Sequence, residues 1–182
     1  KPDGFDGLVP VPWYERGKFL NEKKQFITDP LWHAGTYYVQ EASSMFIDEI
    51  FSQLYPGSSP KNALDLCAAP GGKSTLLQSL LSENSVLTAN EVIQSRARIL
   101  KENHIRLGLS ENLIITQNDP KDFSDLEEFF DYVQIDAPCS GEGMFRKEPK
   151  ALNEWSVGNC QLCSERQKRI LASAFPALSK DA

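Results

Sequence analysis

Long apolar runs and an excess of positive charge are both missing from this sequence. No stretch approaches the roughly 20 apolar residues that a membrane helix needs, and no apolar segment follows Lys1 as it would in a signal peptide. We therefore expect a cytoplasmic protein with no membrane partner. The net charge of -6 argues weakly against nucleic-acid binding, because phosphate contacts need Lys and Arg. Basic residues nevertheless cluster at 16–24, 96–106 and 146–150, where they are either solvated helix faces or RNA contacts.

Histidine and cysteine are also scarce. The two histidines are His33 and His104, and the four cysteines are Cys67, Cys139, Cys160 and Cys163. The uneven cysteine spacing does not suggest a disulfide scaffold. We therefore expect the protein to be located in a reducing compartment. Cys160 and Cys163 form a lone CxxC pair, whereas zinc would need a second pair of ligands. We predict no metal site.

Apolar residues alternate four times between strand-like runs and helix-like spacing. The predicted strands are 63–66, 85–89, 113–116 and 132–135, and the predicted helices are 40–54, one through 76–81, 92–107, 123–130 and 159–178. Alternating strands and helices are typical of an α/β fold with a doubly wound, mostly parallel sheet. In such sheets ligands bind beyond the carboxyl ends of the strands. Residues 1–35, rich in Pro, Gly and aromatics, predict an irregular arm or a small strand pair beside a domain over 36–182.

The turn after the first strand consists of small residues and glycines followed by a helix. Its residues are Cys67, Ala68, Ala69, Pro70, Gly71, Gly72 and Lys73. Such residues let the backbone approach a ligand, and the helix N-terminus favours an anionic group. A phosphate-binding P-loop would need glycine at Cys67, and the adjacent glycines exclude a GxGxxG pattern. A plain strand-to-helix turn is the alternative.

Acidic residues follow the second and third strands. Glu91 lies 20 residues beyond Gly71, the spacing at which an acid accepts hydrogen bonds from ribose hydroxyls in nucleoside-binding folds. A glutamate favoured by the helix dipole is the alternative for Glu91. Asn118 or Asp119 could bind an adenine amino group, although turn chemistry alone would also explain them.

The loop after the fourth strand carries an acid and a thiol. Asp136 and Cys139 are three residues apart. An acid there is costly unless it is hydrogen-bonded, and the thiol would be near solvent. Lys73 is expected to pair with Asp136 from across the sheet, and a separation beyond about 6 Å would exclude that pairing.

Together these motifs resemble the Sun-domain (Fmu-type) RNA cytosine-C5 methyltransferases, in particular their bacterial ribosomal-RNA branch. The matching segments are 38–45, 65–74, 90–91, Asp119, 136–143 and 145–149, within a resemblance from about Trp32 onward. The resemblance implies a Rossmann-like class I methyltransferase fold, S-adenosylmethionine as cofactor and RNA as partner. It also implies that Cys67 to Lys73 border the methionine and ribose, Glu91 the ribose hydroxyls, Asp119 the adenine, and Asp136 the methionine side or the target base.

The chemistry of this family needs a thiolate that adds to carbon 6 of cytosine, because carbon 5 is otherwise a poor nucleophile. DNA cytosine methyltransferases use the thiol of a Pro-Cys pair, as in Pro138-Cys139. In the RNA family that cysteine helps to release the product, while a later Thr-Cys motif supplies the nucleophile. This chain contains no Thr-Cys. We therefore expect the nucleophile and the last strands to lie beyond Ala182, and this piece to bind cofactor without methylating.

Other readings remain open. The chain could be a non-catalytic module that binds S-adenosylmethionine and RNA during ribosome assembly. An amino-nitrogen methyltransferase would need an Asp/Asn-Pro-Pro-aromatic loop after the fourth strand, where this chain has Asp136-Ala-Pro-Cys. A protein or small-molecule methyltransferase would have no use for the Pro-Cys pair.

Overall fold

The computed structural model describes residues 7–20, 25–145, 148 and 150–180. In this part of the chain four strands form a fully parallel sheet in the order β5-β4-β3-β6. The strands are β3 (Asn62–Asp65), β4 (Val86–Asn90), β5 (Leu113–Thr116) and β6 (Tyr132–Gln134). The order reverses beside β3, which pairs with β4 on one side and β6 on the other. Strand ends next to such a reversal are where doubly wound sheets bind ligands.

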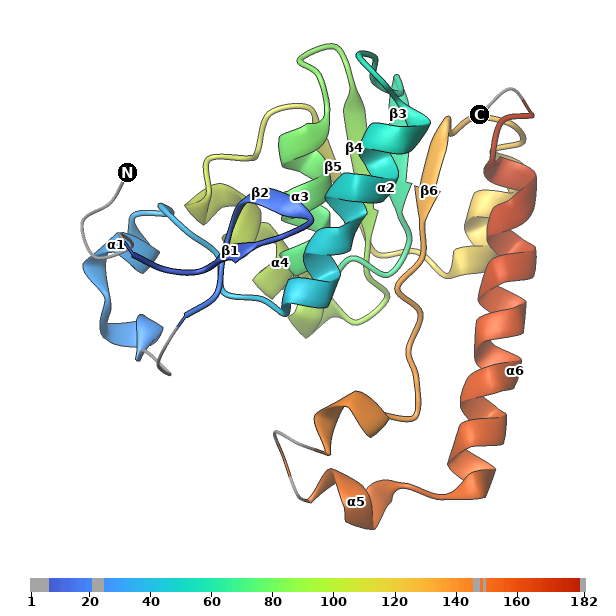
Figure 1. Cartoon of the computed structure of the whole chain (residues 1–182). Coiled ribbons are helices and arrows are strands. Elements are labelled where there is room, and N and C mark those ends of the chain that lie inside the picture. The colour runs from blue at the N-terminus through green and yellow to red at the C-terminus, as the bar shows by residue number, and fades with distance from the viewer. Residues whose placement is uncertain (1–6, 21–24, 146–147, 149, 181–182) are drawn as a thin grey trace.

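Helices cover both faces of this sheet (Figure 1). One face packs against α2 (Phe46–Leu54), α3 (Gly72–Leu80) and α4 (Gln94–Arg106), through Phe51, Leu77 and Leu100. The other face packs against α6 (Val157–Ala174) and the 3-10 helix η5 (Phe175–Ala177). Alternate residues of β3 serve the two faces, with Ala63 in the first core and Leu64 in the second, as the period-2 geometry of a strand requires. The α/β fold with a doubly wound parallel sheet is confirmed.

The N-terminal region contains the small strand pair that the sequence allowed. The antiparallel strands are β1 (Pro10–Val11) and β2 (Tyr14–Lys18). Three short helices follow, η1 (Phe26–Thr28), α1 (Pro30–His33) and η2 (Ala42–Met45). The pair is not independent of the sheet, because Val11 packs with Met45 and with Leu76 of α3 in a third apolar cluster.

Three predicted helices differ from the structure. The helix expected at 40–54 is divided into the 3-10 helix η2 and the α-helix α2, which begins only at Phe46, and residues 40–41 lie outside both. The helix expected at 123–130 is instead a 3-10 helix, η3 (Pro120–Asp125). Glu128 has a φ of 53°, which is incompatible with a right-handed helix, and buried Phe130 bridges Leu178 in parallel. The helix expected at 159–178 begins earlier and gives way to η5, in which Pro176 lacks the amide hydrogen that would continue it. A short helix, α5 (Ala151–Glu154), precedes α6.

Some sequence expectations fall on residues outside the described part. They concern residues 21–24 of the first basic cluster, and 146, 147 and 149 of the third cluster and of the 145–149 match. Residues 1–6 of the N-terminal arm are also outside it. Within the described residues, no helix has the length and apolar character needed to cross a membrane.

Candidate functional site

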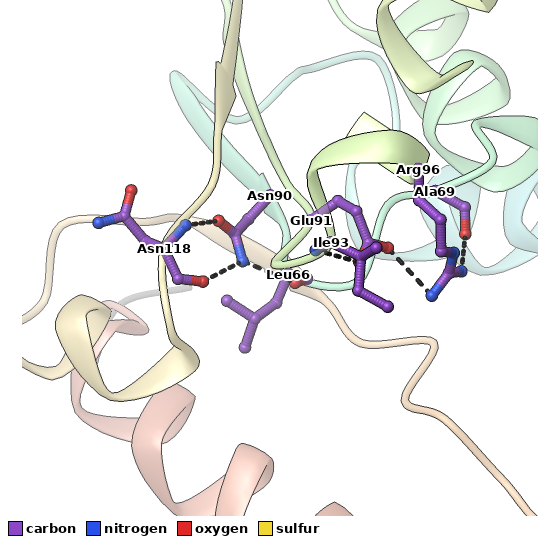
Figure 2. A network of polar contacts seen from close by, with 7 residues as sticks. All are labelled: Leu66, Ala69, Asn90, Glu91, Ile93, Arg96 and Asn118. Atoms are coloured by element: carbon purple, nitrogen blue, oxygen red, sulfur yellow. Dashed lines mark hydrogen bonds and ion pairs between the residues drawn. The ribbon is translucent and has the colours of Figure 1, made fainter. Parts of the chain in front are cut away.

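One buried amide joins the carboxyl ends of three strands. The Asn90 side chain, at the end of β4, donates to the carbonyl oxygens of Leu66 (3.2 Å) and Asn118 (3.0 Å). Its Oδ1 accepts from the amide nitrogen of Asn118 at 2.9 Å and from the Thr116 hydroxyl at 2.8 Å. Figure 2 shows Asn90 between Leu66 and Asn118. The side chain thus makes four hydrogen bonds with no exposed surface, which fixes the chain following β3 against the chain following β5.

Glu91, the next residue, is held by an arginine that the sequence did not single out. The carboxylate is only 4% exposed, and its Oε1 accepts from the amide of Ile93 at 3.0 Å. The Arg96 guanidinium lies 3.3 Å from Oε2 and also donates to the Ala69 carbonyl at 2.8 Å (Figure 2). A buried carboxylate is costly without such partners. Arg96 therefore compensates the burial of Glu91 and ties it to the glycine-rich turn. Besides its place in the basic cluster 96–106, the sequence indicates this role of Arg96 only by its position on the first turn of α4.

Backbone conformation at Gly71 and close protein packing at both positions favour the two glycines of this turn. Gly71 has a φ of 116°, and a Cβ added there would lie 3.3 Å from Leu100. A Cβ on Gly72 would lie 3.2 Å from both the Gln40 amide oxygen and the Tyr38 ring. The side on which their missing side chains would project is thus filled by the protein, whereas the sequence had suggested close approach to a ligand. The amide groups of the first turn of α3 have no partner within the helix and remain suited to an anionic group.

Lys73 and Asp136 form the ion pair that the sequence predicted. Their Nζ and Oδ2 atoms are 2.6 Å apart, well within the 6 Å limit. The contact joins the first turn of α3 to the chain after β6. The side chains are 32% and 54% exposed, so solvent screening leaves the pair little effect on stability. Its importance lies in placing a positive and a negative group together at the reversal of strand order.

Asp65, the last residue of β3, is a buried acid with one unpartnered oxygen. Its Oδ2 accepts from the Gln134 amide at 2.9 Å, and its Oδ1 has no hydrogen-bond partner among the described residues. Burial raises the pKa of Asp65 to about 7, although the hydrogen bonds from the Gln134 side chain and the Cys67 backbone act in the opposite direction. Asp65 lies in the 65–74 match, but no separate role was predicted for it.

Asp119 is already used in local structure. Its Oδ1 accepts from the amide of Lys121 at 3.1 Å and caps η3, while the Asp122 carboxylate accepts from the Asp119 amide at 3.2 Å. This reciprocal capping box is the turn chemistry that the sequence left as an alternative. The exposed Asp119 follows Asn118, which Asn90 binds, so it does lie beside the end of β4. Its role toward adenine stays a prediction.

The cysteines differ in chemical character. Burial raises the pKa of the half-buried Cys67 thiol to about 11, and the charges of Asp65 and Glu91 act in the same direction. Cys67 is therefore a poor nucleophile near neutral pH. Cys139 is exposed in the loop that follows Asp136. Cys160 and Cys163 lie on α6, where their thiols donate to the different partners Glu142 and Asn159.

A separate cavity of about 490 Å³ lies on another side of α3. It is enclosed between β2, the segment 36–42 and α3, and Tyr14, Tyr38, Met45 and Leu76 are among its lining residues. This cavity is not at the strand ends. The structure brings the predicted residues to the same edge of the sheet, while their enclosure of one ligand cavity stays a prediction.

Comparison with known proteins agrees with the arrangement of the strands. A family model described as 16S rRNA methyltransferase RsmB/F matches residues 53–182. Ribosomal RNA small subunit methyltransferase F of Escherichia coli O7:K1 is 38% identical over 177 residues, covering 94% of this chain and 36% of that protein. The protein of the same name from Vibrio cholerae serotype O1 (strain M66-2) is 40% identical over 178 residues, with the same coverage. The chain thus spans 36% of the length of these relatives.

Two solved structures share the fold over most of this chain. NSun6 from Pyrococcus horikoshii, solved with SFG, superimposes with a TM-score of 0.71 at 26% identity, covering 84% of this chain and 38% of that one. A methyltransferase homolog protein from Pyrococcus horikoshii gives a TM-score of 0.74 at 28% identity, covering 94% and 52%. The Rossmann-like methyltransferase fold follows from these matches.

Proposed function

Because the chain belongs to the 16S rRNA methyltransferase RsmB/F family, we propose that it forms the cofactor-binding core of an enzyme that methylates carbon 5 of a cytosine in ribosomal RNA. The cofactor is S-adenosylmethionine. The observation that carries the proposal is the family match over 53–182, which includes the ends of all four strands of the parallel sheet. We divide the chain into an N-terminal arm, residues 1–35, and the methyltransferase domain, residues 36–182. The enzyme would act in the cytoplasm.

The groups at the strand ends fit the chemistry of this cofactor. Its carboxylate suits the free amides of the first turn of α3, next to Lys73. Its amine suits an acceptor, and the unpartnered Oδ1 of Asp65 is a buried acceptor directly before that turn. Glu91 would accept from the ribose hydroxyls, since a carboxylate that already binds Ile93 and Arg96 retains free lone pairs. Asp119 would accept from the adenine amino group.

Bound S-adenosylmethionine would supply an activated methyl group, and the remaining functions belong to the protein. Lys73, which pairs with Asp136, would hold this carboxylate at the reversal of strand order, where it would face the methionine side or the target base. Cys139 is three residues further along and exposed, so its thiol would reach an RNA base brought to this edge. In line with the family resemblance, we assign Cys139 to product release. The high pKa of Cys67 makes that thiol unsuitable for attack.

The proposal is tested by binding and transfer measured separately. Calorimetric titration of the chain with S-adenosylmethionine is expected to show one site, and Glu91→Ala is expected to weaken it at least about tenfold, as loss of a charged hydrogen bond would. Glu102→Ala, an exposed acid on α4, is the matched control. Absence of binding by the unaltered chain would contradict the proposal.

A measurement of methyl transfer from the cofactor to RNA distinguishes the roles of the thiols. With radiolabelled cofactor and ribosomal RNA, we expect no methylation by this chain, which contains no Thr-Cys motif. Methylation by the chain that is abolished by Cys139→Ser would make Cys139 the nucleophile and overturn its assignment to product release. Methylation of the RNA by a longer form that includes a Thr-Cys thiol would exclude the non-catalytic assembly module.

A further inference from the structure

The loop after β6 has a polar centre of its own, separate from the strand ends. The Glu142 carboxylate accepts from the Ser140 hydroxyl at 2.7 Å, the Trp155 indole nitrogen at 2.7 Å and the Cys160 thiol at 3.4 Å. Ser140 belongs to the loop itself, Trp155 to the junction of α5 and α6, and Cys160 to α6. One carboxylate therefore connects three parts of the chain, the farthest of which, at Cys160, lies 18 residues from Glu142.

The loop is also attached on the other side of Cys139. The Gln167 amide, on α6, donates to the Pro138 carbonyl at 3.1 Å. Pro138 precedes Cys139 directly, and Ser140 follows it directly. Cys139 thus lies between two points at which hydrogen bonds attach the loop to α6, one through Gln167 and one through Glu142.

Apolar packing contributes little to this segment. Figure 1 shows that the chain between β6 and α6 runs away from the sheet and that α6 leads back to it. Large apolar side chains of the segment are exposed, with Met144 at 44%, Leu152 at 55% and Trp155 at 41%. Since burial of apolar surface is the main stabilising force elsewhere, the hydrogen bonds must determine the conformation here. Donation by Ser140 and Trp155 lowers the pKa of Glu142 to about 2, so the carboxylate is ionised throughout the neutral range.

We propose that Glu142 is a positioning residue, which fixes the place of Cys139 by fastening the loop after β6 to α6. The inference rests on the proposed function only in that Cys139 is there given a chemical role. Glu142 does not itself contact the reacting atoms. It holds the Ser140 hydroxyl, and through it the neighbouring thiol, at a constant distance from Asp136 and the sheet.

The mobility of a nitroxide label on Cys139 tests the proposal. The background is Cys160→Ser, because a serine hydroxyl can still donate to Glu142. Cys163 is buried and Cys67 has a raised pKa, so neither competes for a thiol-specific reagent, and mass spectrometry confirms single labelling. We expect Glu142→Ala to shorten the rotational correlation time of the label about threefold, as for release of an ordered loop. Glu142→Gln retains one acceptor and should restore part of the immobilisation.

Controls separate positioning from a general loss of structure. Glu165→Ala removes an exposed acid of α6 that does not contact Glu142, and it should leave the mobility of the label unchanged. The Trp155 indole signal in a nitrogen–proton NMR spectrum, assigned with Trp155→Phe, should shift in Glu142→Ala, while thermal unfolding of the chain stays the same. A label as immobile in Glu142→Ala as in the parent chain would overturn the proposal. Failure of the proposed function would appear instead as loss of cofactor binding in the parent chain, which leaves the label measurement unaffected.

Discussion

The Lys73 ammonium lies 2.6 Å from the Asp136 carboxylate, so a residue at the start of α3 pairs with one 63 positions later, after β6. Lys73 lies in the helix that follows β3, and Asp136 lies in the chain that follows β6, the neighbour of β3 at the reversal in strand order. We predict that Lys73→Met lowers the free energy of unfolding by less than about 1 kcal/mol, because the pair is partly exposed. Cofactor affinity should fall about tenfold, since a charge next to the ligand carboxylate is lost. Calorimetry and urea unfolding measure the two effects, and Lys168→Met, which removes an exposed pair with Glu165, is the control.

Arg96 is expected to matter more for stability than Lys73. Arg96→Ala leaves the Glu91 carboxylate buried without its cation, which we expect to cost about 1 to 3 kcal/mol in urea unfolding. The double variant Arg96→Ala, Glu91→Gln should regain part of that loss, because a neutral amide is cheaper to bury. Equal stabilities of the single and double variants would show that Arg96 does not act through Glu91.

The raised pKa of Asp65 predicts that the free energy of unfolding falls as the pH rises. Its folded-state pKa of about 7 is above the ordinary value of 3.8, so the folded protein retains a proton that the unfolded chain has lost. The contribution of the protonated Asp65 side chain to the free energy of unfolding is complete below about pH 4, and it is lost as the pH rises through about 7. Asp65→Asn should therefore stabilise the ligand-free chain at pH 8 relative to the parent, and have a smaller effect at pH 5. Unfolding by urea at the two pH values checks this, and a larger gain at pH 5 would contradict it.

The lowered pKa of His104 predicts the opposite dependence, in which its contribution to the free energy of unfolding increases as the pH rises. It is fully buried, its Nε2 lies 3.1 Å from the Ser74 hydroxyl, and its Nδ1 lies 3.2 Å from the Leu109 carbonyl. Burial lowers the pKa of His104, so as the pH falls the unfolded chain binds a proton at this residue before the folded protein does. Its contribution to stability is present above about pH 6.5 and is lost as the pH falls through the lower folded pKa. An NMR titration of the His104 ring in the folded chain should give a pKa below 6.5, and a value above 6.5 would contradict this account.

Much of the fold could be predicted from the sequence, because the strands are short apolar runs separated by clear turn residues. Gly71 and Lys73 were identified from the turn, and the Lys73–Asp136 pair followed from the parallel order of the strands. Asn90 and Arg96 could not be given roles, because both bind backbone carbonyls, those of Leu66 and Ala69 among them, that only the fold brings near. The predicted helix near Phe123 was wrong, since a positive φ at Glu128 depends on how Phe130 enters the core.

The central claim is that the four strand ends bind one S-adenosylmethionine at a shared edge of the sheet. The most direct test is a nitrogen–proton NMR titration of the labelled chain with that cofactor. We predict that the largest shifts fall on the amides of residues 67–73 and of Glu91, Asp119 and Asp136. Saturating cofactor that instead shifts residues lining the cavity between β2 and α3, or shifts none, would contradict the account.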